Sequence, residues 1–210
     1  MDNEEYIRIR KAEVELNKKI LKTQKKEMVG TSAKLLGMMG DDDVIVMEEE
    51  DDINIVMDFS YCEAIHNGKT GVIVFFDTKP SLSCLEKELC NALLRSYTSF
   101  FRVKDTIPKD GIITLWNLLN NKEIQLKDIN LSKTVFPGLF LFCRILEWKG
   151  MNMTSGIGFI FTKFSEQALL RQYRRDLRKV RYPNESAARF IAAYRMKLVF
   201  GVPMEFTDIC

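Results

Sequence analysis

The chain has 210 residues, of which 46% are hydrophobic and 29% are charged. This composition is typical of a globular protein that can bury a substantial core, and it excludes a disordered chain. The 31 basic and 29 acidic side chains nearly balance, so the net charge of +2 indicates no particular class of partner.

The five cysteines, at positions 62, 84, 90, 143 and 210, form no C-x-x-C pair. An odd and scattered set argues against a disulfide framework and against a zinc site, and favours reduced thiols in the cytoplasm. The charged start MDNEEYIRIRKAEVELNKK lacks the apolar region of a signal peptide. Because no apolar run approaches about 18 residues, we expect no membrane span.

Residues 4–28 are expected to form a helix with one narrow apolar seam. Ile7, Val14, Leu21 and Met28 recur every seven residues, and Ile20 lies beside them. Eight lysines and arginines lie between them, which gives the helix a broad charged face. The pattern is typical of a helix that docks on a partner or on a second copy, or of an arm that packs only with a partner.

The segment from residue 41 to residue 63 is strongly acidic. It contains ten Asp and Glu residues and no Lys or Arg. We interpret residues 41–52 as a linker, because like charges repel and few apolar groups offset the ordering entropy. A helix is expected from residue 53, with Ile55, Val56 and Phe59 on one face and a stop at Asn67-Gly68.

Residues 70–78, TGVIVFFDT, are ambiguous between a buried strand and a short helix, and the flanking helices favour a helix. The next helix is expected to run from Ser83 to about Ser96. Glu86 stands three residues after Ser83, as in a capping box.

Five short apolar segments follow between residues 99 and 162, with turn residues such as Pro108–Gly111, Asn120-Asn121 and Lys149-Gly150 between them. Their regular spacing predicts a small antiparallel β-barrel. Helices then return over residues 165–201, begun by Ser165 and by Asn184 or Ser186 and ended by Gly201. The expected fold class is α+β, with an arm (1–40), a linker (41–52) and one domain (53–210).

The C-terminal helices carry the most suggestive charge pattern. Residues 163–197 hold ten basic and three acidic side chains, a net charge of +7. Arg171, Arg174, Arg175 and Arg178 are spaced to share one helical face, and Lys179 and Arg181 extend it. Arginine binds phosphate oxygens bidentately, so this face could hold nucleic acid. Two alternatives stay open: a solvated face, or docking on the acidic 41–63 segment.

The predicted barrel offers a second surface. Small barrels bind single-stranded nucleic acid or peptides through exposed aromatic rings with basic neighbours, although the fold alone is only an analogy. The side chains that we expect to supply such a surface are Phe100, Arg102, Trp116, Arg144 and Trp148.

No catalytic or metal motif is recognisable. His66 is the only histidine, and Cys62 shares its predicted helical face, but no further residue completes a catalytic set. The acidic run lacks the spacing of a calcium loop, and residues 154–158, TSGIG, lack the lysine of a phosphate loop. The sequence therefore predicts neither a metal nor a cofactor and favours a binding protein over an enzyme.

Between about Met57 and Lys179, an MDF helix and a Leu/Glu-rich helix precede SFFRV, TLWNLLNNKEIQL, PGLFLFCRIL and MTSGIGFIF. This order resembles uncharacterised bacterial proteins in which such a segment accompanies a SecA C-terminal-type zinc motif. The present chain lacks that motif, because its cysteines form no C-x-C set with histidine. The resemblance implies one structural unit over 57–179 and transfers no functional residue.

Taken together, these patterns predict a cytoplasmic, non-enzymatic binding or adaptor protein that meets a protein partner or a second copy of itself through the N-terminal helix. The alternative is a nucleic-acid-binding protein that uses the arginine-rich helix and the aromatic residues of the barrel.

Overall fold

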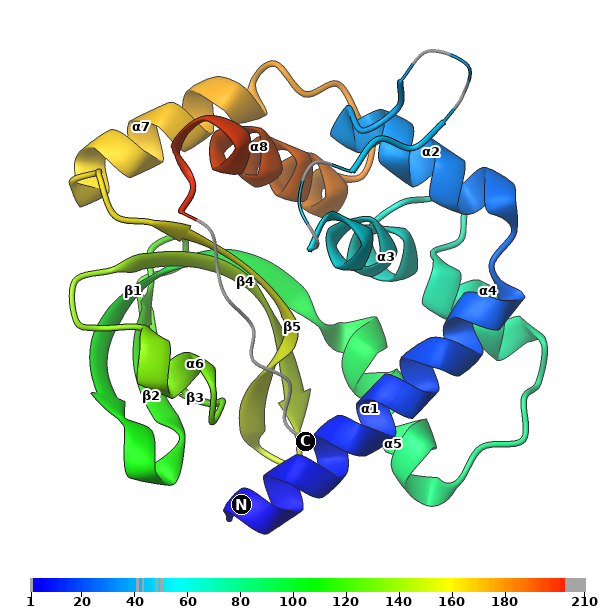
Figure 1. Cartoon of the computed structure of the whole chain (residues 1–210), viewed down its shortest axis with the longest axis horizontal. Helices are drawn as coiled ribbons and strands as arrows, with labels where there is room; N and C mark the ends of the chain where they lie inside the picture. The colour runs from blue at the N-terminus through cyan, green and yellow to red at the C-terminus, as the bar shows by residue number, and fades with distance from the viewer. Residues whose placement is uncertain (1, 41, 43, 48, 50, 203–210) are drawn as a thin grey trace.

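The computed structural model describes residues 2–40, 42, 44–47, 49 and 51–202, which form a curled five-stranded sheet with helices packed over it (Figure 1). The helices are α1 (Asn3–Thr23), α2 (Lys26–Leu36), α3 (Asp52–Cys62), α4 (Gly71–Asp77), α5 (Cys84–Arg95), α6 (Leu131–Thr134), α7 (Glu166–Leu177) and α8 (Glu185–Phe200). The strands are β1 (Tyr97–Ile107), β2 (Ile112–Asn117), β3 (Lys122–Lys127), β4 (Phe140–Trp148) and β5 (Met151–Phe161), with a 3-10 turn η2 (Pro108–Asp110) after β1. The predicted α+β class is confirmed.

The predicted helix over residues 4–28 is two helices rather than one. Gln24 and Lys25 have extended backbone angles and separate α1 from α2. The Ser60 hydroxyl of α3 donates to Gln24 Oε1 at 2.7 Å, which holds the chain where it turns. The turn lets α1 and α2 bury different faces, because a straight helix would carry α2 away from α3 and α8, which it contacts.

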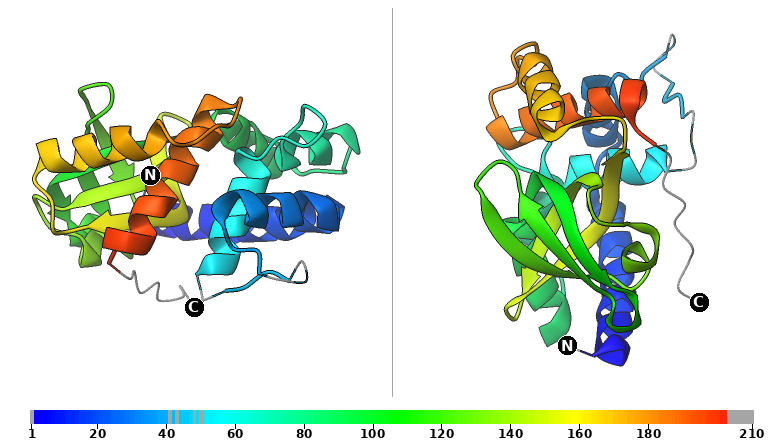
Figure 2. Two further views of the ribbon diagram at one scale, coloured as in Figure 1. Left: turned by 90° about the horizontal axis from the view of Figure 1, so that it is seen from above. Right: turned by 90° about the vertical axis from the view of Figure 1, so that its left-hand side faces the viewer.

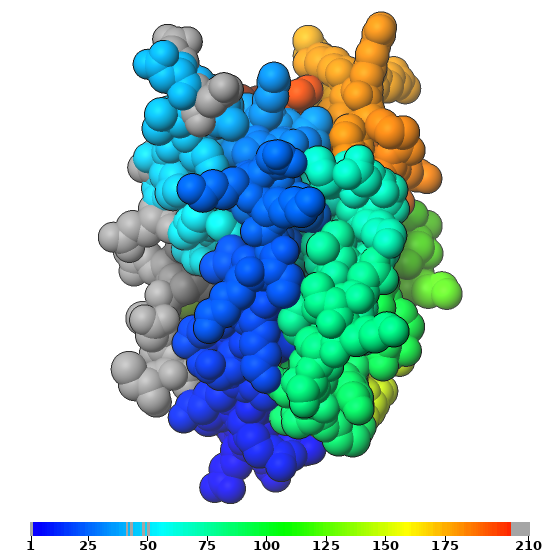
Figure 3. All heavy atoms as spheres, turned by 90° about the vertical axis from the view of Figure 1, so that its right-hand side faces the viewer, coloured from blue at the N-terminus to red at the C-terminus, as the bar shows by residue number. Residues whose placement is uncertain are grey.

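The predicted apolar seam of residues 4–28 is divided by the fold: Ile20 and Met28 are buried, whereas Ile7, Val14 and Leu21 line a groove. The helix buries Tyr6, Ile9, Glu13, Leu16 and Ile20, whereas Val14 is 52% exposed and Leu21 is 41% exposed. A helix of 3.6 residues per turn that packs on two neighbours, here α4 and α5, buries a broader face than a seven-residue repeat describes. The repeat therefore follows the edge of the buried face, where Val14 and Leu21 are exposed. Figure 3 shows α1 on the surface, side by side with α5.

Other local predictions are confirmed. The ambiguous segment at residues 70–78 contains the helix α4. At the start of α5 the Ser83 side chain accepts from the Glu86 N–H, and the Glu86 carboxylate accepts from the Ser83 N–H, which completes the capping box. Ser165 and Asn184 cap α7 and α8 in the same way, each accepting from the N–H three residues on.

The five strands pair in the order β1–β2–β3–β5–β4, and β4 pairs again with β1. Four of these pairings are antiparallel, but β3 meets β5 in parallel through one residue pair, Leu126 with Asn152. The prediction of five strands is confirmed, whereas antiparallel pairing throughout is wrong at this junction. Physically, β3 and β5 are separated by α6 and β4, so they need not run as a hairpin.

The strand β4 is buried on both faces along almost its whole length, and Figure 2 shows α7 and α8 together on one side of the curled sheet. On one face Phe101 packs with Ile113, Leu141 and α6 residues, and on the other Phe100 packs with Phe142 beneath α7 and α8. Strands buried on both faces read as unbroken apolar runs, which explains the segment LFLFCRIL. Phe100 therefore cannot belong to an exposed barrel surface, and that prediction is corrected.

Arg144 and Trp148 are likewise buried, contrary to the predicted surface. Arg144 lies on β4 and is 1% exposed, and its guanidinium donates to both oxygens of Asp58 at 2.9–3.1 Å. It also donates to Glu63 at 2.8 Å and to the Ser96 hydroxyl at 3.3 Å. These contacts fix α3, and the residues after it, against the sheet.

Replacing Arg144 with methionine is expected to lower the free energy of unfolding by about 3–5 kcal/mol, because the carboxylates of Asp58 and Glu63 would stay buried without a cation. Urea unfolding followed by circular dichroism measures the loss. Arg102→Met is the matched control. Arg102 pairs with Glu166 at the surface, so its loss is expected to cost at most about 1 kcal/mol. Equal losses in the two variants would contradict the assignment.

Candidate ligand-binding groove

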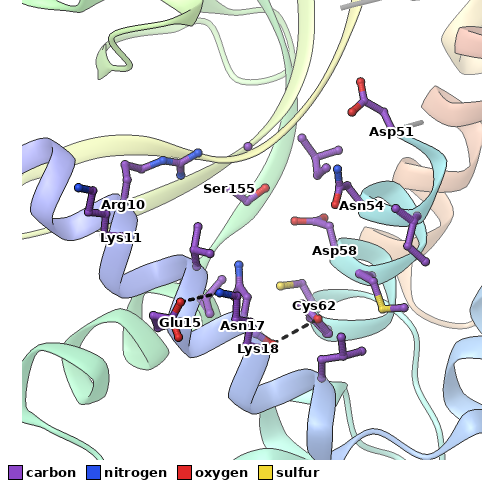
Figure 4. A pocket seen from close by; sticks show the side chains of 18 of the residues that line it. Arg10, Lys11, Glu15, Asn17, Lys18, Asp51, Asn54, Asp58, Cys62 and Ser155 are labelled. Atoms are coloured by element: carbon purple, nitrogen blue, oxygen red, sulfur yellow. Dashed lines mark hydrogen bonds and ion pairs between the residues drawn. The ribbon is translucent and has the colours of Figure 1, made fainter. Parts of the chain in front are cut away.

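A groove of about 990 Å³ opens between α1, α3 and β5. One wall is the face of α1 from Tyr6 to Leu21, and the other is α3 from Asp51 to Cys62. The strand β5 contributes Ser155 and its neighbours at one end (Figure 4). Its volume lies at the upper end of the range, roughly 300–1,000 Å³, that ligand pockets usually have.

The outer part of the groove is apolar. Ile7, Val14 and Leu21 of α1 line it; of these residues of the seven-residue repeat, Val14 and Leu21 are exposed and Ile7 is half-buried. Ile53 and Met57 line the α3 side. A continuous apolar surface of this kind, framed by charged side chains, is typical of a binding site.

A polar row on α1 borders the groove, and three of its four members, all but Glu13, line it. Tyr6, Arg10, Glu13 and Asn17 are spaced by four, three and four residues and so share one helical face. Arg10 Nη1 donates to Glu13 Oε2 at 2.6 Å and to the Thr154 carbonyl oxygen at 2.7 Å. Glu13 is only 2% exposed, and its second oxygen, Oε1, has no hydrogen-bond partner within the described residues.

Asp128 closes the end of the row. It accepts from the Thr154 hydroxyl at 2.8 Å and from the Leu131 N–H at 2.9 Å, and the Tyr6 hydroxyl hydrogen bonds to it. Burial raises the pKa of Tyr6 well above its ordinary value, so this hydroxyl stays protonated and remains a donor. Asp128 therefore joins α1 to the end of β3 and to β5.

Burial also governs the pKa of Glu13. It raises this pKa, and the nearby carboxylates of Asp58 and Asp128 add to the effect, while the Arg10 guanidinium opposes it. The balance is a pKa above the usual value, because removing the carboxylate from water outweighs its single ion pair. The carboxyl group thus lies within electrostatic reach of two acids that line the groove.

The α3 wall presents Asn54, Asp58 and Cys62, spaced four residues apart and directed toward α1 (Figure 4). Asp58 is held by Arg144 from behind. Burial raises the pKa of the Cys62 thiol to about 12, so the reactive thiolate is scarce near neutral pH. Cys62 does not share a helical face with His66, because α3 ends at Cys62 and His66 lies in the turn that follows.

A bulge in β5 directs Ser155 toward the groove. The pairing of β4 with β5 shifts register between Cys143 and Ile145, and Gly156 has a φ of 91°. A methyl group added at Gly156 would lie 3.2 Å from Arg10 Nη2, so glycine is needed both for its backbone and for this approach. Ser155 points into the cavity (Figure 4), and its Oγ has no partner within the described chain.

The predicted arginine-rich face lies elsewhere, on α7, away from the groove (Figure 1). Its six basic side chains are all exposed: Arg171, Arg174, Arg175, Arg178, Lys179 and Arg181. Among the described residues only Lys179 of this set forms an ion pair, with Asp176 at 2.9 Å. The described acids of the 41–63 segment that pair with a lysine, Glu49 and Asp52, do so with Lys197 of α8 instead.

Of the predicted barrel surface, only Arg102 and Trp116 are partly exposed. Arg102 pairs with Glu166 at 3.0 Å, and Lys104 lies 5.7 Å from the centre of the Trp116 ring. These two residues are too few to form a stacking surface for successive bases. They lie near the start of α7 and could only extend its basic face.

Sequence reasoning did not select the groove. In the sequence Arg10 is one of many charges on the predicted charged face, and Asp58 and Glu63 are two of the ten acids of the 41–63 segment. The available signal was the polar row at residues 6, 10, 13 and 17, which interrupts an apolar helix face at helical spacing. It remained ambiguous because the same spacing also fits an exposed face.

Two further findings concern metal binding and membrane insertion, and both apply to the described residues. Nowhere in that part of the chain do three or more His, Cys, Asp or Glu side chains lie where they could jointly hold a metal ion. None of its helices combines the length and apolar character needed to cross a membrane.

Residues 1–207 match the profile of a family described as Family of unknown function (DUF7986). The chain belongs to this family. No curated protein and no solved structure matches it. The resemblance to proteins with a SecA-type zinc motif stays a prediction.

The raised pKa of Glu13 predicts a pH dependence of stability. Between the ordinary pKa of about 4.5 and the raised one, the folded chain binds more protons than the unfolded chain, so this residue makes the free energy of unfolding fall as pH rises. Glu13→Gln is expected to remove that component, which amounts to at most about 1.4 kcal/mol per pH unit. Urea unfolding from pH 4.5 to 7 measures the slope.

Glu15→Gln is the matched control, because Glu15 lies at the exposed rim of the same helix. We expect it to leave the slope of the wild-type protein unchanged. A slope that is identical in the Glu13→Gln and Glu15→Gln variants would contradict the assignment to Glu13.

Proposed function

We propose that the protein is an intracellular adaptor that holds an amphipathic helix of a partner protein in the groove between α1 and α3. The observation that carries this proposal is the exposure of Val14 and Leu21 along one wall, in line with the half-buried Ile7. The fold buries a different face of α1, so these apolar side chains are available for binding. Binding of a helix in an apolar groove is a recurring mode of peptide recognition.

The dimensions suit a helix. The lining residues of α1 run from Tyr6 to Leu21, which at 1.5 Å per residue corresponds to roughly 22 Å, or about four helical turns. Ile53 and Met57 face the stripe from α3 at a spacing of one turn. A bound helix would present one apolar stripe to both walls.

The charges at the rim favour a partner over a second copy. Lys11, Lys18 and Glu15 give the α1 rim a net charge of +1, and Asp51 lies on the α3 rim. Two copies of α1 packed antiparallel about Val14 would bring Lys18 of one against the basic residues of the other, which is unfavourable. A partner helix with acidic residues toward α1 would be complementary.

As part of this proposal, the protein works in a reducing compartment of the cell. Cys62, Cys84, Cys90 and Cys143 are free thiols, and such thiols persist where disulfides do not form. The barrel-like closure of the sheet is likewise proposed as a rigid support, against which α1 and α3 hold their separation.

Val14→Asp is expected to weaken binding of a 15-residue amphipathic helix at least about tenfold, because it removes a buried apolar contact and places a charge there. The probes are two synthetic peptides with the same leucine face, one flanked by glutamates and one by lysines. Fluorescence anisotropy gives their affinities. The glutamate-flanked peptide is expected to bind about threefold more tightly, in line with the energy of surface ion pairs.

Val199→Asp is the matched control, because Val199 of α8 is 70% exposed and lies outside the groove. It is expected to bind both peptides as the wild-type protein does. Equal binding by Val14→Asp and the wild-type protein would refute the proposal. So would the absence of binding of either peptide to the wild-type protein at peptide concentrations up to about 1 mM, which corresponds to a very weak complex. Sedimentation at increasing concentration tests whether a second copy occupies the groove instead.

We propose nucleic-acid binding by α7 as a second candidate function. The specific observation is that Arg171, Arg174, Arg175 and Arg178 project from one face, are exposed, and have no ion pair with another described residue. Unpaired guanidinium groups need not give up an internal partner to bind phosphate. The Lys179 and Arg181 side chains continue the same face toward the turn before α8.

Changing Arg171, Arg174, Arg175 and Arg178 together to glutamine is expected to abolish binding of a fluorescent single-stranded oligonucleotide. With four phosphate contacts, the logarithm of the affinity should fall against the logarithm of salt concentration with a slope of about −3. A matched variant changes Lys22, Lys25, Lys26 and Lys34, which are exposed on α1, α2 and their junction, to glutamine. Similar loss in both variants, or no binding by the wild-type protein at low salt, would exclude α7 as the site.

A further inference from the structure

We propose that the open edge of β5 is a docking surface for an extended strand and that its occupant is residues 203–210 of this chain. These residues follow Val202, the last residue that the structure describes. The inference goes beyond the proposed function, because it concerns the backbone of β5 rather than the apolar walls of the groove.

One edge of β5 is open over part of its length. The opposite edge pairs with β4. On the open edge, β3 meets Asn152 and Val202 meets Ile160. Among the described residues no strand pairs with positions 155–158 between them, and all four are partly exposed. Such an edge presents backbone N–H and C=O groups with which another strand can pair.

The bridge to Val202 sets the hydrogen-bonding phase of this edge. The Val202 N–H donates to the Ile160 carbonyl oxygen at 3.0 Å, and the bridge is antiparallel. Along a strand, the backbone groups of successive residues alternate between the two edges. Phe159 therefore directs its N–H and C=O to β4, and Gly158 directs its own to the open edge. An antiparallel strand that continued from Val202 would find Gly158 as its next pairing site.

The chain beyond Val202 is directed along this edge toward the groove. Because the bridge is antiparallel, a continuing strand runs from Ile160 toward Ser155. A small cavity of about 20 Å³, lined by Gly158 and Val202, leads the same way, and Ile157 lines both this cavity and the groove. At about 3.3 Å per residue, the path from Ile160 to Ser155 is roughly 17 Å, and the eight residues after Val202 reach roughly 26 Å.

The sequence after Val202 fits this phase. Pro203 would direct its backbone nitrogen away from β5, where the missing N–H of a proline costs no pairing. Met204 would lie opposite Gly158, which has no side chain and leaves room on the face where Val202 packs with the core. Phe206 would continue the same apolar face, because alternate residues of a strand share a face.

Covalent attachment favours this occupant over a strand from another molecule. A segment joined through a short flexible linker has an effective concentration in the millimolar range. Here Val202 is itself paired with β5, so the segment needs no linker to reach the edge. A second copy of the chain would have to compete with that local concentration.

The docked segment would also cover the β5 end of the groove, since Ile157 belongs to the edge and lines the groove. It would then compete with a bound helix, and this consequence rests on the proposed function. A competing segment lowers the apparent affinity for the helix in proportion to the fraction of molecules in which the groove is open.

Met204→Pro tests the pairing, because it removes the N–H that would donate to the Gly158 carbonyl oxygen. The measurement is amide hydrogen exchange of Gly158 in the ¹⁵N-labelled full chain, since the docked segment would accept this N–H. We expect the exchange to be about fivefold or more faster in Met204→Pro than in the wild-type protein, as the loss of one hydrogen bond would give. Glu205→Pro is the matched control. Its backbone nitrogen would face away from β5, so Gly158 is expected to keep the wild-type rate.

Equal exchange rates of Gly158 in the wild-type protein, Met204→Pro and Glu205→Pro would overturn the docking. Equal acceleration by the two prolines would overturn it as well, because the phase of the pairing distinguishes them. A protection of Gly158 that increases with protein concentration would assign the edge to a second copy and exclude the segment of the same chain.

The glutamate-flanked peptide measures the competition. Met204→Pro is expected to bind it about fivefold or more tightly than the wild-type protein does, because the competing segment is released. Unchanged affinity together with faster exchange at Gly158 would overturn the competition and support the docking. If neither protein binds the peptide, the proposed function fails, and the exchange of Gly158 still decides the docking.

Discussion

The buried ion pair between Arg144 and Asp58 is the contact on which the rest of the site depends. An arginine in the middle of a strand that is covered on both faces is tolerated only when its donors are satisfied, and Asp58 accepts two of them in a bidentate arrangement. Because Asp58 lies on α3, this requirement sets the distance and orientation of α3 relative to β4. Glu63 adds a second anchor beyond the end of the helix. One wall of the groove is therefore positioned by electrostatics within the sheet rather than by its own packing alone.

The opposite wall is positioned at the same irregularity of the sheet. Arg10 donates to the Thr154 carbonyl oxygen, which lies beside the bulge in β5, and Arg144 itself stands where the register of β4 and β5 shifts. A bulge bends a strand and redirects its side chains. Here it frees a carbonyl for Arg10, leaves room for the guanidinium over Gly156 and directs Ser155 inward. Both helices thus attach to one point of the sheet, and the groove is the space between them.

Local features were predictable from the sequence, because they depend on neighbouring residues. The capping box at Ser83 and the strands between turn residues need no tertiary information. The burial of Arg144 was not predictable in the same way. Its neighbours Leu141 to Leu146 are apolar, which is compatible with an exposed charge on an edge or with a buried one that has a partner 86 residues away. The buried face of α1 was not predictable for a related reason, because a seven-residue repeat does not indicate which neighbours a helix packs against.

This ambiguity bears on function. Val14 is exposed, so the folding of the chain places little demand on its apolar character, and a polar residue there would improve solubility. Ile7 and Leu21 repeat the same chemistry at one-heptad intervals along the wall, next to a polar row in which Asn17 Oδ1 has no partner among the described residues. An apolar stripe beside unsatisfied acceptors is unfavourable in water for two independent reasons. The amphipathic helix that we propose as the occupant would cover the exposed apolar side chains and would bring polar groups to the unpaired atoms.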